Sequence, residues 1–201
     1  EESGSYFPVF MGQPGAPYGT VNGMPRYAKW ESEGWEDSIY FSWHSNATGG
    51  HTGHGTQMYV YAPGQEPPGP FSAFGGVVGG DTLATRIFDE VMNDIHVDWD
   101  AAWPGGKHSA YFGELNPSNN DEMPACLLEV AYHDSATDQP SLLDPRFRDL
   151  VARACYQGIV KWCCRTAGER PGSSSASGAR TTAAATSPTR SARPRGSRRR
   201  R

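Results

Sequence analysis

The sequence predicts an α/β fold in which helices flank a mixed β-sheet to give three layers. Two runs rich in aromatic, β-branched or other apolar residues, 38–43 and 125–131, have the composition and length of buried strands. Two longer segments, 82–97 and 144–162, repeat apolar residues at helical spacing. Because strands that alternate with helices are typical of α/β layer folds, we expect this architecture.

Three strands are expected, and two of them carry a polar residue that does not match its surroundings. The first, 38–43, leads directly into His44. The second, 57–62, follows a loop rich in Gly and His and ends at a Pro-Gly turn. The third, 125–131, is an apolar run interrupted only by Glu129, as expected of a strand buried on both faces.

Two amphipathic helices are expected to cover the sheet. In 82–97 the first amides can be capped by Asp81 or Thr82. The last helix begins with Asp144 as its N-cap and Pro145 as its first residue. One apolar stripe predicts that this helix packs across the sheet, and it consists of Phe147, Leu150, Val151, Ala154, Ile159 and Trp162.

The chain divides into a body, 1–165, and a tail, 166–201. The body holds 9 Lys and Arg against 21 Asp and Glu, whereas the tail holds 9 Arg against one Glu. Within the body, 1–36 is expected to be loop-rich, with one short helix near 26–30, because Gly, Pro and turn signals are frequent there. A chain of 201 residues is long enough for one domain with a sizeable core.

The tail is expected to be disordered, because its Ser, Ala, Thr, Gly and Pro content cannot bury enough apolar surface. It ends in four arginines, which could bind nucleic acid or an anionic envelope polymer through counterion release. Runs of like charge are more often simply solvated. We therefore predict no dedicated nucleic-acid partner.

Composition also limits the other classes of protein. No run of about 18 apolar residues is present, so no membrane span is predicted. The four cysteines fit neither a disulfide framework nor zinc-ribbon spacing, and Cys126 and Cys155 are expected in the core. Since the chain starts with Glu1 and shows no signal-peptide pattern, we expect a fragment of a longer product. A monomer is the default expectation.

His44 and Glu129 are the main candidates for chemistry. Strand ends in an open α/β sheet converge on one edge, and desolvation raises the pKa of a carboxyl toward the range of a general base. Each residue also has a structural interpretation, as a hydrogen-bonded core histidine and as a carboxylate satisfied by backbone amides or by Arg86. With zinc the pair would be coherent, because imidazole ligates the ion and a carboxylate takes a proton from bound water.

The other histidines carry weaker signals. His51 and His54 lie three apart in a glycine-rich loop, a spacing compatible with metal binding only if the loop folds back. His133 follows the third strand and could line the mouth of a site. His108 could lie at the edge of a substrate site, and the segment 111–114 could contact the substrate.

Several segments together resemble a known family. Residues 42–47, Ser-Trp-His-Ser-Asn-Ala, are similar to the S-x-H-x-N-A segment of zinc-dependent N-acetylmuramoyl-L-alanine amidases, which cut peptidoglycan between muramic acid and L-alanine. Residues 123–132 resemble the P-A-x-L-x-E-x-G-F segment of the same family, and 55–61 resemble its glycine-led strand. Order and spacing agree over 38–164. The departures include Ala131-Tyr132, where Gly-Phe is usual.

The resemblance implies a bacterial cell-wall hydrolase with zinc as its cofactor and peptidoglycan as its partner. His44 would be a zinc ligand, and Glu129 would be the catalytic carboxylate that activates zinc-bound water and protonates the leaving amine. Asn46 would support the strand that carries the ligand. The substrate implies a secreted protein that works outside the cell or in the periplasm.

The family places two further zinc ligands upstream of S-x-H-x-N-A, and neither precedes His44 here. Either the upstream half is left out of this chain or the site is degenerate. We expect the first, a phosphorylase/hydrolase-like amidase fold that is incomplete at its N-terminus, with 1–165 as the C-terminal part of the catalytic domain. A catalytic zinc usually needs three protein ligands. The chain alone is thus expected to bind zinc poorly and to be inactive.

Two other functions remain open. One is a zinc carboxypeptidase-like hydrolase of a different amide. The other is a non-catalytic module that binds glycan or the cell envelope through aromatic stacking, for which the candidates are Trp30, Trp35, Trp43, Trp99 and Trp103.

Overall fold

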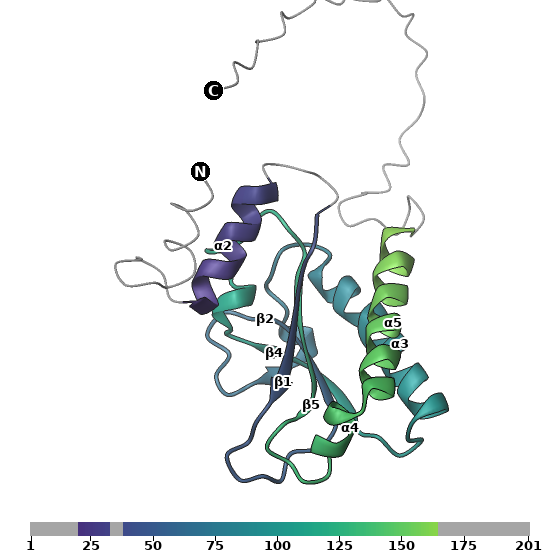
Figure 1. Ribbon diagram of the computed structural model, residues 1–201. Coiled ribbons are helices and arrows are strands. Elements are labelled where there is room, and N and C mark those ends of the chain that lie inside the picture. The colour runs from purple at the N-terminus through teal and green to yellow at the C-terminus, as the bar shows by residue number, and fades with distance from the viewer. Residues whose placement is uncertain (1–19, 33–37, 165–201) are drawn as a thin grey trace, which may run out of the picture.

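The computed structural model describes residues 20–32 and 38–164 (Figure 1). Helices and strands alternate along much of this range, as the sequence predicts. The helices are α2 (Thr20–Ser32), α3 (Gly80–Asp98), α4 (Gln139–Leu143) and α5 (Pro145–Cys163), with short 3₁₀ turns η1 (Phe71–Ala73) and η2 (Gly113–Leu115). The strands are β1 (Tyr40–Asn46), β2 (Thr56–Tyr61), β3 (Gly69–Pro70), β4 (Gly105–Ala110) and β5 (Ala125–Tyr132).

The strands form one mixed sheet in the order β1-β5-β2-β4-β3. The pairs β1–β5 and β2–β4 are parallel, whereas β2–β5 and β3–β4 are antiparallel. The three predicted strands are confirmed as β1, β2 and β5. Strand β4 is not predicted by the sequence, because Gly-Gly-Lys-His-Ser-Ala has little intrinsic β-propensity and is held as a strand by its pairing with β2.

One face of the sheet forms the main core. The apolar side chains of Met58, Val60, Leu128 and Val130 are buried there under α3 and α5 (Figure 1). The two helices approach closely at Gly158, where an added Cβ would lie 2.5 Å from Ile87 Cα. The predicted packing of the last helix across the sheet is therefore confirmed, and the expected core positions of Cys126 and Cys155 are confirmed as well.

The predicted cap of the last helix is also present. The side chain of Asp144 accepts a hydrogen bond of 2.8 Å from the backbone amide of Arg146, and Pro145 is the first helical residue. The guanidinium of Arg146 and this amide together lower the pKa of Asp144 to about 2.

The expectation of a loop-rich segment over 1–36 is wrong for 20–32. This stretch forms α2, which contains Pro25 and is longer than the short helix expected at 26–30. The helix packs against η2, on the side of the sheet away from α3 and α5 (Figure 1). Tertiary contacts such as the 3.1 Å hydrogen bond from Asn119 to Asn22 stabilise it beyond its own propensity. The predictions for 1–19, 33–37 and the tail fall outside the described residues.

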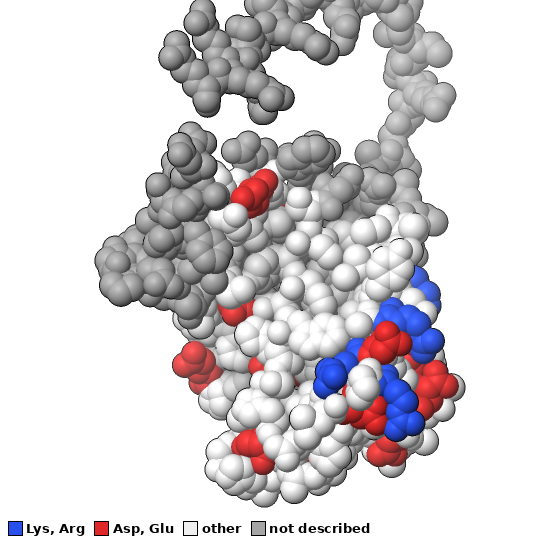
Figure 2. All heavy atoms as spheres, viewed as in Figure 1, with Lys and Arg blue, Asp and Glu red and all other residues white. Residues whose placement is uncertain are grey.

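Charged side chains gather over one side of the molecule (Figure 2). Arg153 lies 3.4 Å from both Asp94 and Asp98, and Lys161 pairs with Glu90, so basic and acidic groups of α3 and α5 neutralise each other. Among the described residues, the face shown in Figure 2 therefore presents no extended basic patch. Within the described part of the chain, no helix is long and apolar enough to cross a bilayer.

Candidate functional site

The two residues singled out from the sequence lie side by side. His44 on β1 and Glu129 on β5 are register partners in a parallel pair, and their side chains both reach the face of the sheet opposite α3 and α5. A bulge follows His44, between it and Asn46. The expected convergence of the two side chains is confirmed, and it arises from strand register.

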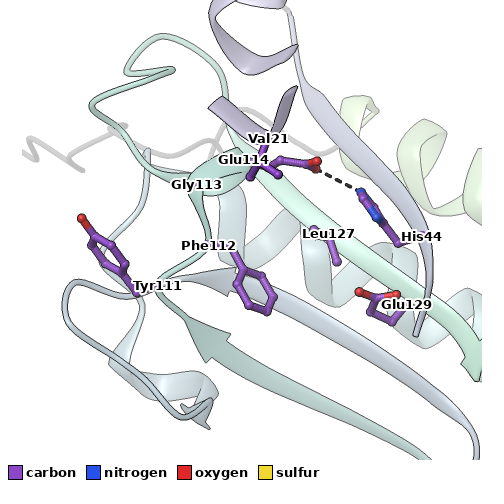
Figure 3. Close-up of a pocket in the computed structure, with 8 residues that line it drawn as sticks. All are labelled: Val21, His44, Tyr111, Phe112, Gly113, Glu114, Leu127 and Glu129. Carbon is purple, nitrogen blue, oxygen red and sulfur yellow. Dashed lines mark hydrogen bonds and ion pairs between the residues drawn. The ribbon is translucent and has the colours of Figure 1, made fainter. Parts of the chain in front are cut away.

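These side chains line a cavity of about 230 Å³ (Figure 3). Its floor includes Leu127 of β5, and Val21 of α2 stands at its rim. The remaining wall is the segment 111–114, for which the sequence predicts contact with a substrate. Tyr111 and Val21 are exposed, and most of the lining is apolar around the polar side chains of His44, Glu114 and Glu129.

Glu114, for which the sequence predicts only a place in the segment 111–114 and no role of its own, is part of the site. Its side chain is buried, and its Oε2 lies 3.1 Å from Nε2 of His44 (Figure 3). Ser42 donates a hydrogen bond to the same oxygen and lies 2.9 Å from Nε2 of His44. No spacing rule links Glu114 to β1, because the contact depends on how η2 folds over the strand.

Glu129 is half-buried, and one of its oxygens has no hydrogen-bond partner. Burial raises the pKa of Glu129, and the negative charge of Glu114 raises it further, whereas His44 and His133 act in the opposite direction. The interpretation that amides or Arg86 fully satisfy this carboxylate is wrong for Oε2, which contacts no donor among the described residues. Oε2 is thus an unsatisfied acceptor beside the cavity that His44 and Glu129 line, and an unsatisfied buried carboxylate of this kind marks a candidate functional residue.

The cavity contains the types of donor atom that zinc prefers, but too few side chains that carry them. An imidazole nitrogen and a carboxylate oxygen 3.1 Å apart, those of His44 and Glu114, have the donor chemistry that zinc prefers. However, no three His, Cys, Asp or Glu side chains of residues 20–32 and 38–164 group closely enough to hold a metal. The described residues therefore do not form a three-ligand zinc site.

Asn46 lies at the end of β1, beyond the cavity. Its side chain accepts from the amide of Ala47 at 2.8 Å, and its carbonyl accepts from the amide of His133 at 2.9 Å. His133 also contacts the hydroxyl of Ser45. These contacts join the ends of β1 and β5 and so support the strand that carries His44.

His51 and His54 belong to a loop that does fold back, onto the end of β5. His54 contacts the carboxylate of the fully buried Asp138, which also accepts from the amides of Gly55 at 2.9 Å and Tyr132 at 3.0 Å. His51 instead lies 2.8 Å from a backbone oxygen of Asp134. The two histidines have different partners, so the fold-back serves the structure of the loop.

His108 lies on β4, outside the lining of the cavity. Its Nε2 is 2.6 Å from the side-chain oxygen of Gln57, and its ring is stacked at a tilt on Tyr59, with ring centres 5.4 Å apart. Burial lowers the pKa of His108. The ring of Tyr59 also contacts Phe112, which does line the cavity.

The sequence and the fold agree with one family of cell-wall hydrolases. Residues 20–161 match the family model of N-acetylmuramoyl-L-alanine amidases. No individual curated protein matches the sequence. Because the family match covers most of the chain, the chain belongs to the N-acetylmuramoyl-L-alanine amidase family.

Solved amidase structures share the fold. An N-acetylmuramoyl-L-alanine amidase from Clostridium difficile 630 aligns with 18% identity and a TM-score of 0.53, covering 73% of this chain and 67% of that chain. AmiC2 of Nostoc punctiforme aligns with 21% identity and a TM-score of 0.51, covering 68% of this chain and 64% of that chain. Ami1 from Mycobacterium smegmatis aligns with 15% identity and a TM-score of 0.50, covering 69% of this chain and 59% of that chain. The chain thus spans between 59% and 67% of these three proteins.

Proposed function

We propose that this chain acts on peptidoglycan, at the amide that joins the lactyl group of N-acetylmuramic acid to the first L-alanine of the peptide. Family membership supports the substrate class, and one observation supports the site: an unpaired carboxylate oxygen of Glu129 in a cavity beside His44. Such a substrate lies in the cell envelope, so we also propose an extracellular or periplasmic location.

In this proposal Glu129 moves the proton. Amide hydrolysis needs a base that takes a proton from water and then delivers a proton to the leaving amine, here that of L-alanine. A carboxyl whose pKa is raised by burial holds a proton more readily than an exposed one, which suits the second of these steps. The apolar side chains of Phe112 and Leu127 border the carboxylate and contribute to its desolvation.

Zinc dependence is the finer part of the proposal. His44 would be one ligand, but the described residues do not complete a three-ligand site. We therefore propose that residues 1–201 alone bind zinc weakly and cleave no peptidoglycan unless zinc is in large excess.

The same incomplete donor set favours a second candidate, a module that binds peptidoglycan without cutting it. Both candidates require peptidoglycan binding, whereas only the first requires release of free peptide stems. In this second candidate the exposed aromatic Tyr111 at the cavity rim would contact the ligand.

The deciding experiment uses the full chain with soluble muropeptides, with and without excess zinc, and detects free peptide stems by mass spectrometry. We expect slow release in excess zinc, abolished in both Glu129→Gln and His44→Ala, while Glu129→Gln still binds peptidoglycan. Unchanged release by Glu129→Gln would show that our role for this residue is wrong. Binding that survives both substitutions, with no release at any zinc concentration, would establish the binding module instead.

A further inference from the structure

A row of register partners crosses the sheet through Glu129. The pairing places His44 beside Glu129, Glu129 beside Gln57, and Gln57 beside Gly106. Residues directly opposite one another in a sheet point to the same face. Since neighbouring strands lie about 4.8 Å apart, Gln57 flanks the carboxylate on the side away from His44.

The side chain of Gln57 is held in one orientation. Its Oε1 accepts a hydrogen bond from Nε2 of His108 at 2.6 Å, and an amide oxygen can only accept, so this nitrogen of the imidazole carries the proton. The imidazole is fixed in turn by its contact with the ring of Tyr59. The amide oxygen of Gln57 is therefore already used.

Gly106 leaves the space that this pair occupies. A Cβ at Gly106 would lie 2.7 Å from Nε2 of His108 and 2.8 Å from Oε1 of Gln57, which is closer than real Cβ contacts allow. Gln57 faces Gly106 across the β2–β4 pair, and His108 lies two residues further along β4. The missing side chain of Gly106 therefore leaves room for the contact between the amide and the imidazole, and a Cβ there would displace them.

The remaining hydrogen-bonding group of Gln57 is its Nε2, a donor of two hydrogens. In the part of the chain that the structure describes, no hydrogen bond from this nitrogen is formed, whereas Oε1 is bonded. The Nε2 of Gln57 is a donor, and the unpaired Oε2 of Glu129 is an acceptor. A peptide unit has the complementary groups, because its carbonyl accepts a hydrogen bond and its N–H donates one.

We propose that Gln57 is a substrate-positioning residue, whose Nε2 donates a hydrogen bond to a backbone carbonyl oxygen of the bound peptide stem next to Glu129. His108 and Gly106 fix the direction in which the amide donates. Gln57 lies on β2, next to the cavity but not among the residues that line it. The inference therefore rests on the proposed function and assumes that a muramoyl peptide bound in the cavity extends across β5 to β2.

Binding measurements test the role of the amide without requiring turnover. We would titrate the full chain with a soluble muramoyl tetrapeptide in the presence of a chelator and measure the dissociation constant calorimetrically. Gln57→Ala should weaken binding about five- to tenfold, the effect of one net hydrogen bond. Gln57→Glu should weaken it more, since an acceptor replaces the donor beside Glu129. Gln157→Ala on α5 is the matched control and should bind as the wild type does.

A second pair of variants tests whether His108 and Gly106 hold the side-chain amide of Gln57 in its orientation. Gly106→Ala should weaken binding although no ligand contact is removed, whereas Gly50→Ala, where the nearest atom to a new Cβ is 3.8 Å away, should not. His108→Phe keeps a ring against Tyr59 but removes the donor, so it should resemble Gly106→Ala. It also keeps the test valid if Gly106→Ala fails to fold.

The outcomes separate this inference from the function on which it rests. If the wild type does not bind the muramoyl tetrapeptide, the proposed function is wrong, and the inference fails with it. If the wild type binds and Gln57→Ala binds equally well, the role of Gln57 alone is overturned. The peptide-free disaccharide is an additional probe, and its affinity should be the same for the wild type and Gln57→Ala.

Discussion

The imidazole of His44 and the carboxylate of Glu114 meet 3.1 Å apart, although 70 positions separate them in the chain. Ser42 bonds to both, so three polar groups close one end of the cavity. Glu129, the register partner of His44, keeps a buried oxygen without a hydrogen-bond partner. The hydrogen bonds of the site are therefore unevenly satisfied, and Gln57 is the partner of Glu129 on the next strand.

The contact between Glu114 and β1 should contribute to stability. Glu114→Ala leaves His44 and Ser42 without their shared partner, and we expect the free energy of unfolding to fall by about 1–3 kcal/mol. Urea denaturation with a chelator present measures this. Glu122→Ala is the comparison, because it removes only an exposed ion pair with Lys29, worth about 0–1 kcal/mol. Equal losses in the two variants would contradict a structural role for the buried carboxylate.

The raised pKa of Glu129 should make stability depend on pH. The unfolded carboxyl loses its proton near its ordinary pKa of 4.5, while the folded one retains it to a higher pH. Between these two pKa values the folded state binds more protons, so this residue lowers stability as the pH rises through that window. We would measure the free energy of unfolding of Glu129→Gln and of the wild type with a chelator present. The difference between them should favour the variant more at pH 7.5 than at pH 4. Parallel pH profiles for the two proteins would contradict the shift.

Among the acidic residues that contact the loop of His51 and His54, Asp138 should be the one whose substitution lowers the stability of the protein most. It is fully buried and accepts from two backbone amides as well as from His54, so Asp138→Ala orphans several buried donors. We expect a loss of about 3–5 kcal/mol in the free energy of unfolding, measured by urea denaturation. Asp89→Ala, on the solvent side of α3, serves as the control and should change the value by less than about 0.5 kcal/mol.

Gly158 should tolerate no side chain. An added Cβ would lie 2.5 Å from Ile87 Cα and 2.9 Å from the backbone oxygen of Arg86, and backbone atoms cannot yield as a flexible side chain does. Gly158→Ala should therefore lower the melting temperature through overpacking worth about 1–3 kcal/mol, although alanine favours helix more than glycine does. A higher melting temperature would mean that α3 and α5 can separate at little cost.

The sequence by itself determined those elements that local patterns encode. Apolar periodicity and the Asp144 cap located α3 and α5, and the composition of short runs located β1, β2 and β5. The pairing of His44 with Glu129 could also be anticipated, because each residue was polar within an apolar strand and parallel strand ends share one edge.

The tertiary structure alone decided the rest. Residues 105–110 become β4 because β2 offers unpaired backbone groups, and 20–32 become α2 because η2 offers a surface. The contact of Glu114 with His44 and the position of Gln57 beside Glu129 follow from chain folding and strand register. Local propensity spans a few residues, whereas hydrogen bonds across a sheet join positions dozens of residues apart, and no spacing within one segment specifies them.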